Sequence, residues 1–324
     1  MGPPMAIDGA FGREQVISSE ELAPYLTRNN CDGLIQLAGH MALMVGTGFL
    51  IYCSLDSAWV WAAMLAHGIV LAFLFAPVHE CSHRTPFKSR RLNDTVYWLV
   101  ALIYLVPPNF FRYAHATHHK YTQIRGWDPD MVLPRQATLW HYLYYVSAFP
   151  FFKRNLLWLL RHAGGRITPS QRYYLPANKD TVVIGEARII WLIYGAIATT
   201  AFWFESWAPV TYWLLPRLMG EPVMRWLRIA EHGECPETPD LRENTRTTYA
   251  PRWLHFLFWN MSYHAEHHLS PMVPFHALPR FHERVKDEVF PAADSYGAVH
   301  ADVLRKITSG EGVTWEAGAT HSTD

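Results

Sequence analysis

The 324-residue chain carries little charge and few cysteines. Only 17% of its residues are charged, and 28 basic residues balance 28 acidic ones. Because no net positive charge is present, the composition argues against a nucleic-acid partner. The four cysteines (Cys31, Cys53, Cys81 and Cys235) form no C-x-x-C pair, which argues against a disulfide framework and a thiolate zinc site. What the chain has instead is apolar and aromatic sequence, with 14 tryptophans and 18 histidines.

Two apolar runs, 34–55 and 58–78, are separated only by Asp56 and Ser57. Each run is long enough to cross a hydrocarbon core of about 30 Å, which needs roughly 20 helical residues. The short connection therefore predicts a transmembrane hairpin. Two single histidines within it, His40 and His67, are expected to pack against neighbouring helices.

A second apolar region is less regular. Residues 189–204 and 207–216 are apolar and are joined by Glu205 and Ser206. Beyond them Arg217, Glu221 and Arg225 interrupt the pattern, so a return helix must be shielded by protein as it leaves the bilayer toward Arg228. Hydropathy alone also permits a single tilted span here. The aromatic segments 96–111 and 139–160 suit helices that lie in the membrane interface.

Lysine and arginine placement orients these segments. The turns at 56–57 and 205–206 contain neither residue, whereas 84–188 contain fifteen. By the positive-inside bias, both termini and the central segment are cytoplasmic. We therefore predict an all-α integral membrane protein with two transmembrane hairpins (four spans) and a cytoplasmic helical cap. The expected divisions are an N-terminal cytoplasmic tail (1–33), the membrane domain (34–290) and a C-terminal cytoplasmic tail (291–324). Within the N-terminal tail, the cap-like sequence Ser18-Ser19-Glu20-Glu21-Leu22 predicts a short amphipathic helix that reaches about Arg28.

Three short clusters contain eight histidines and would lie in this cap. They are H-x-x-x-H (His79, His83) and two copies of H-x-x-H-H (His115, His118, His119 and His264, His267, His268). Helical positions i and i+4 share a face, so His79 and His83 can reach one metal ion. In each H-x-x-H-H cluster we expect the i/i+3 pair to share a face and the last histidine to point about 100° away. Such a helix can ligate two metals, and imidazole suits iron, zinc and copper.

The series of three clusters resembles the histidine boxes of the membrane fatty acid desaturase and hydroxylase superfamily. The similarity extends to residues 115–131, HATHHKYTQIRGWDPDM, and to residues 260–274, NMSYHAEHHLSPMVP. The resemblance implies a non-haem centre of two iron ions, with dioxygen as co-substrate. It also implies a ninth ligand near the exit of the last span, where His232 stands in the sequence Ala-Glu-His-Gly. Glu80, Asp128, Glu231 and Glu266 are candidates for orienting the ligand imidazoles.

The expected function is desaturation or hydroxylation of an unactivated C–H position in a fatty acyl or lipid-like substrate. A small metabolite, such as an amino-acid derivative, is the alternative substrate. Trp98, Tyr104, Trp191 and Trp259 are aromatic candidates for lining its cavity.

A different enzyme class also matches one box. His79-Glu80-Cys81-Ser82-His83 fits H-E-x-x-H, the signature of zinc metalloproteases. A membrane protease of this kind would leave the two H-x-x-H-H clusters without a role.

Electrons for an oxygen-dependent reaction must come from another protein. The chain lacks a His-Pro-Gly-Gly haem motif, a dinucleotide glycine fingerprint after a strand and a cysteine set for an iron–sulfur cluster. A ferredoxin, or a small haem carrier with its reductase, is therefore the expected partner besides the lipid bilayer. Lys88, Arg90 and Arg91 are candidates for docking it, although they also fit an ordinary positive-inside anchor. The expected location is a bacterial inner membrane, with the metal site facing the cytoplasm.

Overall fold

The computed structural model describes residues 16–131 and 138–309, and these residues are almost entirely helices and connections. The prediction of an all-α protein is confirmed: the described chain has no strand, and its β-structure is an isolated bridge between Thr248 and Ala293. The longer helices are α3 (Cys31–Ser54), α4 (Val60–Ala72), α5 (Phe75–His83), α6 (Arg90–Tyr104), α7 (Pro108–Lys120), α8 (Leu139–Val146), α9 (Phe149–Ala163), α10 (Asp180–Trp203), α11 (Leu215–His232) and α15 (Tyr296–Ser309). The short ones are α2 (Ser19–Leu22), α12 (Arg252–Leu257), α13 (His264–Leu269), α14 (Leu278–Val285), the 3₁₀ turns η1 (Ala23–Tyr25), η2 (Pro169–Gln171) and η3 (Ala177–Lys179), and the π-helical η4 (Val210–Leu214).

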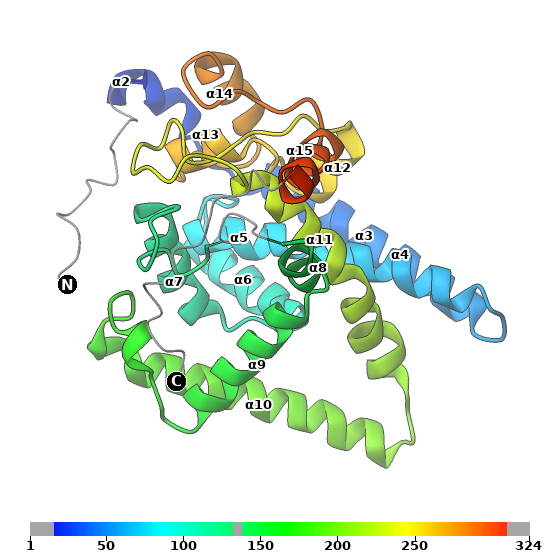
Figure 1. Cartoon of the computed structure of the whole chain (residues 1–324). Coiled ribbons are helices and arrows are strands. Elements are labelled where there is room, and N and C mark those ends of the chain that lie inside the picture. The colour runs from blue at the N-terminus through cyan, green and yellow to red at the C-terminus, as the bar shows by residue number, and fades with distance from the viewer. Residues whose placement is uncertain (1–15, 132–137, 310–324) are drawn as a thin grey trace.

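The first predicted hairpin forms α3 and α4, which run side by side as an arm that extends from the body (Figure 1). Two helical stretches here, Cys31–Ser54 and Val60–His83, are long and apolar enough to cross a membrane. The second is interrupted between α4 and α5. Since Pro77 has no N–H to donate, the Phe73 carbonyl instead accepts the Ala76 N–H at 3.0 Å. The stretch ends at His83, which places the first box at its inner end.

The two isolated histidines of this hairpin pack as expected. The His40 ring contacts the Val70 carbonyl at 3.0 Å. The His67 ring lies 2.8 Å from the Thr47 hydroxyl and 3.0 Å from the Tyr212 carbonyl. Each imidazole therefore links neighbouring helices and stands apart from the three boxes.

The second apolar region forms one long helix and a charged return helix. Ala177–Trp203 is the third stretch, in the described part of the chain, that is long and apolar enough to cross a membrane. The return path, η4 and α11, does not qualify, since α11 carries Arg217, Glu221 and Arg225 within its length. All three side chains are buried, and Glu221 pairs with both arginines. This agrees with the expectation that protein shields the return helix.

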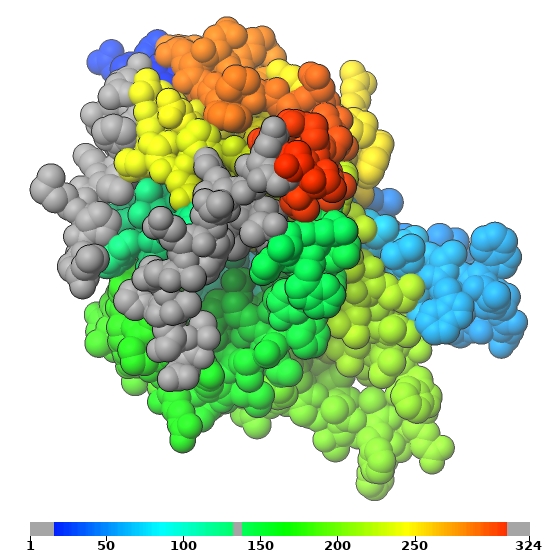
Figure 2. All heavy atoms as spheres, in the orientation of Figure 1, coloured from blue at the N-terminus to red at the C-terminus, as the bar shows by residue number. Residues whose placement is uncertain are grey.

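Two arms project from the body (Figure 2), and apolar side chains are exposed on both of them. On α3, Val45 is 70% exposed, and at the far end of α10 Phe202 is 85% exposed. Exposed tryptophans gather at both outer turns, as is typical of a membrane–water interface. The fold therefore suits association with a membrane.

Segments at both ends of the chain pack against the body. The predicted helix near residues 18–28 is shorter than expected: the Ser18–Glu21 capping box is present, but α2 ends at Leu22 and a 3₁₀ turn follows, since Pro24 cannot continue an α-helical ladder. Leu22 is buried in a cluster with Phe281 of α14. At the other end, α15 packs on α8 and α11. These contacts cover the histidine-bearing helices from the side opposite the arms (Figure 1).

The crossing of α4 and α11 depends on two glycines. A Cβ atom on Gly68 would lie 1.9 Å from the Pro216 carbonyl oxygen, and one on Gly220 would lie 2.0 Å from the Gly68 carbonyl. The two backbones are therefore in direct contact, as small residues permit in membrane helix pairs. This crossing fixes α11 relative to α4, which leads directly into the helix α5 that carries the first box.

Substituting Gly220→Ala should destabilise the protein by about 1–3 kcal/mol, because the added methyl group forces the helices apart. Thermal unfolding of the detergent-solubilised protein measures this change. Gly195→Ala is the matched control: Gly195 lies in helix α10 with open space around its Cβ position, and alanine there should be neutral or slightly stabilising. Equal stability of the two variants would contradict the close crossing.

Candidate metal centre

Nine histidines from four helices meet in the interior of the protein. Helix α5 ends with His79 and His83, α11 ends with His232, and the other six come from α7 and α13. Eight of the nine are buried and His83 is partly exposed. All nine histidines singled out in the sequence therefore come together, although they are spread over residues 79–268.

The way helix α7 begins determines where the histidines of the second box lie. Helix α7 begins at Pro108, whose fixed φ suits the first helical position. The buried Glu186 carboxylate of α10 accepts the Asn109 N–H at 2.7 Å and the Phe110 N–H at 3.3 Å. A carboxylate from another helix thus caps α7 and satisfies amide groups that no intrahelical partner serves. The capped helix directs its last two turns at α5 and α13.

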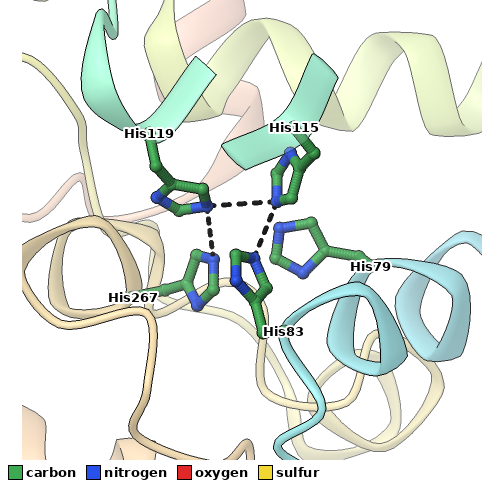
Figure 3. A group of neighbouring side chains, drawn as sticks. All are labelled: His79, His83, His115, His119 and His267. Carbon is green, nitrogen blue, oxygen red and sulfur yellow. Dashed lines mark hydrogen bonds between the residues drawn. The ribbon is translucent and has the colours of Figure 1, made fainter. Parts of the chain in front are cut away.

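Five of the histidines form the first group: His79, His83, His115, His119 and His267 (Figure 3). One ring nitrogen of each lies within 4.8 Å of all the others. The Nε2 atoms of His83 and His115 are 2.9 Å apart, and those of His119 and His267 are 3.1 Å apart. His79 completes the group, its ring centroid 4.5 Å from that of His267.

The remaining four histidines form the second group. His118, His232 and His268 lie together, and His264 joins them with its Nε2 atom 3.0 Å from that of His232. The Glu231 carboxylate stands beside this group, 3.8 Å from His264 Nε2. The two groups adjoin, because the rings of His119 and His268 stack with centroids 4.2 Å apart.

The division within each H-x-x-H-H box differs from the expected one. The predicted i/i+3 pair is split: His115 and His119 (i, i+4) enter the first group while His118 enters the second. The third box is arranged conversely, with His264 and His268 in the second group and His267 in the first. Residues i and i+4 of a helix lie on one face, so the two rings of such a pair can converge on one point. Each box still serves both groups.

These nitrogens fit a pair of metal ions bound by imidazole. Two nitrogen ligands at about 2.1 Å from one ion, at right angles, lie about 3 Å apart, which matches the 2.9–3.1 Å separations between Nε2 atoms. Neutral imidazoles cannot satisfy so many facing nitrogens by hydrogen bonds alone, since each ring has one N–H. Both ring nitrogens of buried His79 lack a partner, as do Nε2 of His118 and His268.

The electrostatics keep most of these rings neutral. Burial, and then the neighbouring imidazoles, lower the pKa of His115, His119 and His268 well below the usual value for histidine. Neutral imidazole is the form that binds a metal ion. His118 is the exception: burial acts to lower its pKa, but the carboxylates of Asp128 and Asp130 together raise it above the usual value.

Four carboxylates were candidates for orienting the imidazoles. Asp128 does contact a box histidine: its Oδ1 lies 2.8 Å from His118 Nδ1, leaving Nε2 to face the second group. Glu80 and Glu231 lie farther from their histidines, each at 3.8 Å. Glu266 contacts none of the nine and instead binds Thr247 and His282.

Two contributors were missed by the sequence reading. The Thr122 hydroxyl lies 3.1 Å from His268 Nδ1 and so leaves Nε2 of that ring unpartnered. His282 holds Glu266, one residue before His267. Thr122 stands four residues after His118, a helical spacing that in principle signals proximity, but threonine is too common for that spacing to single it out.

The sequence of this chain is similar to those of proteins that have known families. The sequence profile of the Fatty acid desaturase family matches residues 56–299. The chain belongs to this family. The match spans all three boxes and His232, and it favours an oxidoreductase over the zinc metalloprotease that H-E-x-x-H alone permits.

Several characterised relatives are lipid desaturases. An sn-1 oleoyl-lipid 12-desaturase of Anabaena variabilis is 26% identical, over 74% of this chain and 70% of the relative. One from Synechocystis with the same name is 24% identical, over 80% and 76%. The sn-1 acyl-lipid omega-3 desaturase (ferredoxin) of Nostoc is 25% identical, over 75% and 72%.

Substituting Asp128→Asn should weaken metal binding about 10–100-fold, the usual cost of losing a carboxylate that orients a ligand histidine. The measurement is metal retained after dialysis against a graded series of chelator concentrations. Asp240→Asn is the control, because Asp240 is also buried but pairs with Arg242 outside the histidine groups. Identical chelator curves for the two variants would remove Asp128 from the site.

Proposed function

We propose that this family member is a membrane di-iron oxidoreductase that uses dioxygen to desaturate or hydroxylate an unactivated C–H position of a fatty acyl or lipid-like substrate. The observation that carries this proposal is the pair of adjoining, buried, all-nitrogen histidine groups. Histidine nitrogen suits iron, and two groups that share the helices α7 and α13 suit two ions held close together.

The ligand assignment follows the two groups. His79, His83, His115, His119 and His267 would hold one ion, and His118, His232, His264 and His268 the other. The bound iron supplies the activation of dioxygen and the abstraction of hydrogen. Desaturation consumes O₂, two electrons and two protons with two substrate hydrogens and yields a C=C bond and two waters; hydroxylation yields an alcohol and one water.

The protein's own side chains would prepare the site for this chemistry. Asp128 and Thr122 set the orientation of His118 and His268 through their Nδ1 atoms. Phe111 stacks on His115 with centroids 5.2 Å apart, and Phe75 lies 5.6 Å from His79. These rings exclude water from one side of the first group, which protects a reactive centre from side reactions.

Electrons would come from an external ferredoxin or from a haem carrier with a reductase. The name of the Nostoc relative includes ferredoxin, which supports a ferredoxin as the electron donor. Lys88, Arg90 and Arg91 are exposed at the start of α6, a few residues beyond His83. An acidic carrier docked there would approach the partly exposed member of the first group.

The metal content and the reaction product test this proposal together. The purified protein should contain two irons per chain, and His232→Ala should lower bound iron and abolish turnover, as should alanine at any of the eight box histidines. His141→Ala is the control, since His141 contacts Thr138 outside both groups. Mass spectrometry of the products distinguishes loss of two hydrogens from gain of one oxygen. Full iron and turnover in several box variants would contradict the assignment.

We further propose that the chain crosses a bacterial inner membrane four times, with α11 as the fourth span and the histidine groups on the cytoplasmic side. Three helices are apolar enough to cross, in the ranges 16–131 and 138–309. The charged α11 returns to the same histidine groups that α5 reaches after the first hairpin. An even number of spans follows if α5 and α11 both end on one face.

Cysteine labelling tests this topology. Native Cys31 and Cys53 are exposed near opposite ends of α3. In a Cys31→Ser background, Cys53 should react from the outside, because it lies near an outer turn; with Cys53 also replaced by Ser, cysteines introduced at Asp56 and Ser206 should react from the same side. With Cys53 also replaced by Ser, cysteines at Lys88, Gly164 and Thr308 should react only from the cytoplasmic side. Outside labelling at Thr308 would indicate an odd number of spans.

A further inference from the structure

A cavity with buried arginines in its wall adjoins the first histidine group. A narrow cavity of about 30 Å³ is lined by His115, by apolar rings that include Phe111 and Tyr104, and by Asn155, Arg225 and Arg228. A second cavity of about 150 Å³ shares Asp130, Phe151, Arg154 and Arg225 with it. Of the four aromatic residues suggested by the sequence for the cavity wall, Tyr104 lies in this wall, whereas Trp259 is buried in the core.

The charges around the cavity do not balance. Asp130 pairs with Arg154 and Arg228, and Arg228 also pairs with Glu231, so this set has equal numbers of each sign. Closer to the start of α11, the Glu221 carboxylate forms ion pairs with both Arg217 and Arg225. Two guanidinium groups on one carboxylate leave one formal positive charge, buried in protein. Such a charge is costly unless an anion compensates it.

Three side-chain N–H donors without hydrogen-bond partners belong to residues that line this cavity. Arg225 is 3% exposed and Asn155 is 6% exposed. The Arg225 Nε and the Asn155 Nδ2 each lack a hydrogen-bond partner, and so does the Nε of Arg154. All three residues line the narrow cavity, and Arg154 and Arg225 also line the second one. Buried donors are nearly always satisfied in proteins, so three in one cavity indicate an acceptor that binds there.

We propose that the substrate oxidised at this centre is a compact carboxylic acid whose carboxylate binds Arg154, Asn155 and Arg225. The inference rests on the proposed di-iron function, and for its substrate it favours the small-metabolite alternative over an acyl lipid. A monoanion matches the single unbalanced charge better than a phosphate dianion does. Since His115 lines the same narrow cavity as Arg225 and Asn155, the oxidised carbon lies a few bonds from the carboxylate.

Ligand binding without turnover tests this proposal. The purified, iron-loaded protein in detergent is titrated with hexanoate, the neutral hexanamide and hexyl phosphate, and affinity is read from the rise in melting temperature with ligand concentration. Hexanoate should bind at least tenfold more tightly than either other probe. Equal binding of hexanoate and hexanamide overturns the proposal, and preferential binding of hexyl phosphate overturns the carboxylate assignment.

Substitutions in the cavity wall test whether hexanoate binds in this cavity. Arg154→Gln and Asn155→Leu should each weaken hexanoate binding about tenfold. Arg172→Gln should leave it unchanged: the Arg172 side chain is 41% exposed, against 39% for Arg154, and likewise pairs with one aspartate, but it lies outside the cavity. Hexanoate binding that is unaffected by Arg154→Gln would indicate that the carboxylate binds elsewhere, the iron included, and overturns the proposal.

The two proposals fail separately. Two irons per chain and oxidation of an uncharged acyl lipid, without selective hexanoate binding, would overturn the carboxylate site alone. Selective hexanoate binding in a protein that holds no iron would overturn the di-iron function and leave the anion site standing.

Discussion

The burial of nine imidazoles at one point is the constraint on which the rest of the structure depends. Each ring carries a nitrogen that has no protein partner or that faces another ring nitrogen. Polar atoms in such numbers are unfavourable in a protein interior unless something else binds them. Two metal ions would meet this need, and the helices around the site are arranged to bring ligands from four directions. The short α13 and the capped α7 make sense as supports for side chains rather than as packing elements.

Helix α11 connects the membrane region to this centre. Its buried charged residues would be unfavourable in lipid, and they persist because each finds a partner within the protein. The glycine contact with α4 lets α11 approach the first hairpin closely enough for such shielding. The same helix brings Arg225 to the cavity and ends with His232 in the second histidine group. The packing of the first hairpin, the arginine of the cavity wall and one member of the second histidine group therefore depend on one element.

The cavity beside His115 bears on the substrate of this family member. The relatives whose names specify a substrate are acyl-lipid desaturases, at 24–26% identity. Identity at that level is compatible with similar histidine boxes and a different cavity, because the boxes occupy few positions and much of the cavity wall comes from α9 and α11. An arginine-lined wall next to His115 favours a charged substrate group near the reacting carbon, where an extended acyl chain would require an apolar wall.

The sequence by itself determined the helical class, the first hairpin and all nine histidines of the centre. These features are local: apolar length defines a span, and a box of histidines at helical spacing is recognisable in a few residues. Tertiary structure alone decided which histidines share a group, since ring direction depends on the partner helices and split each H-x-x-H-H box otherwise than helical geometry suggested. It also decided that Glu266 contacts His282, that Thr122 supports His268, and that Arg154 and Arg225 line one cavity. Those contacts join residues up to 146 positions apart, and nothing in a local pattern records which distant side chains will meet.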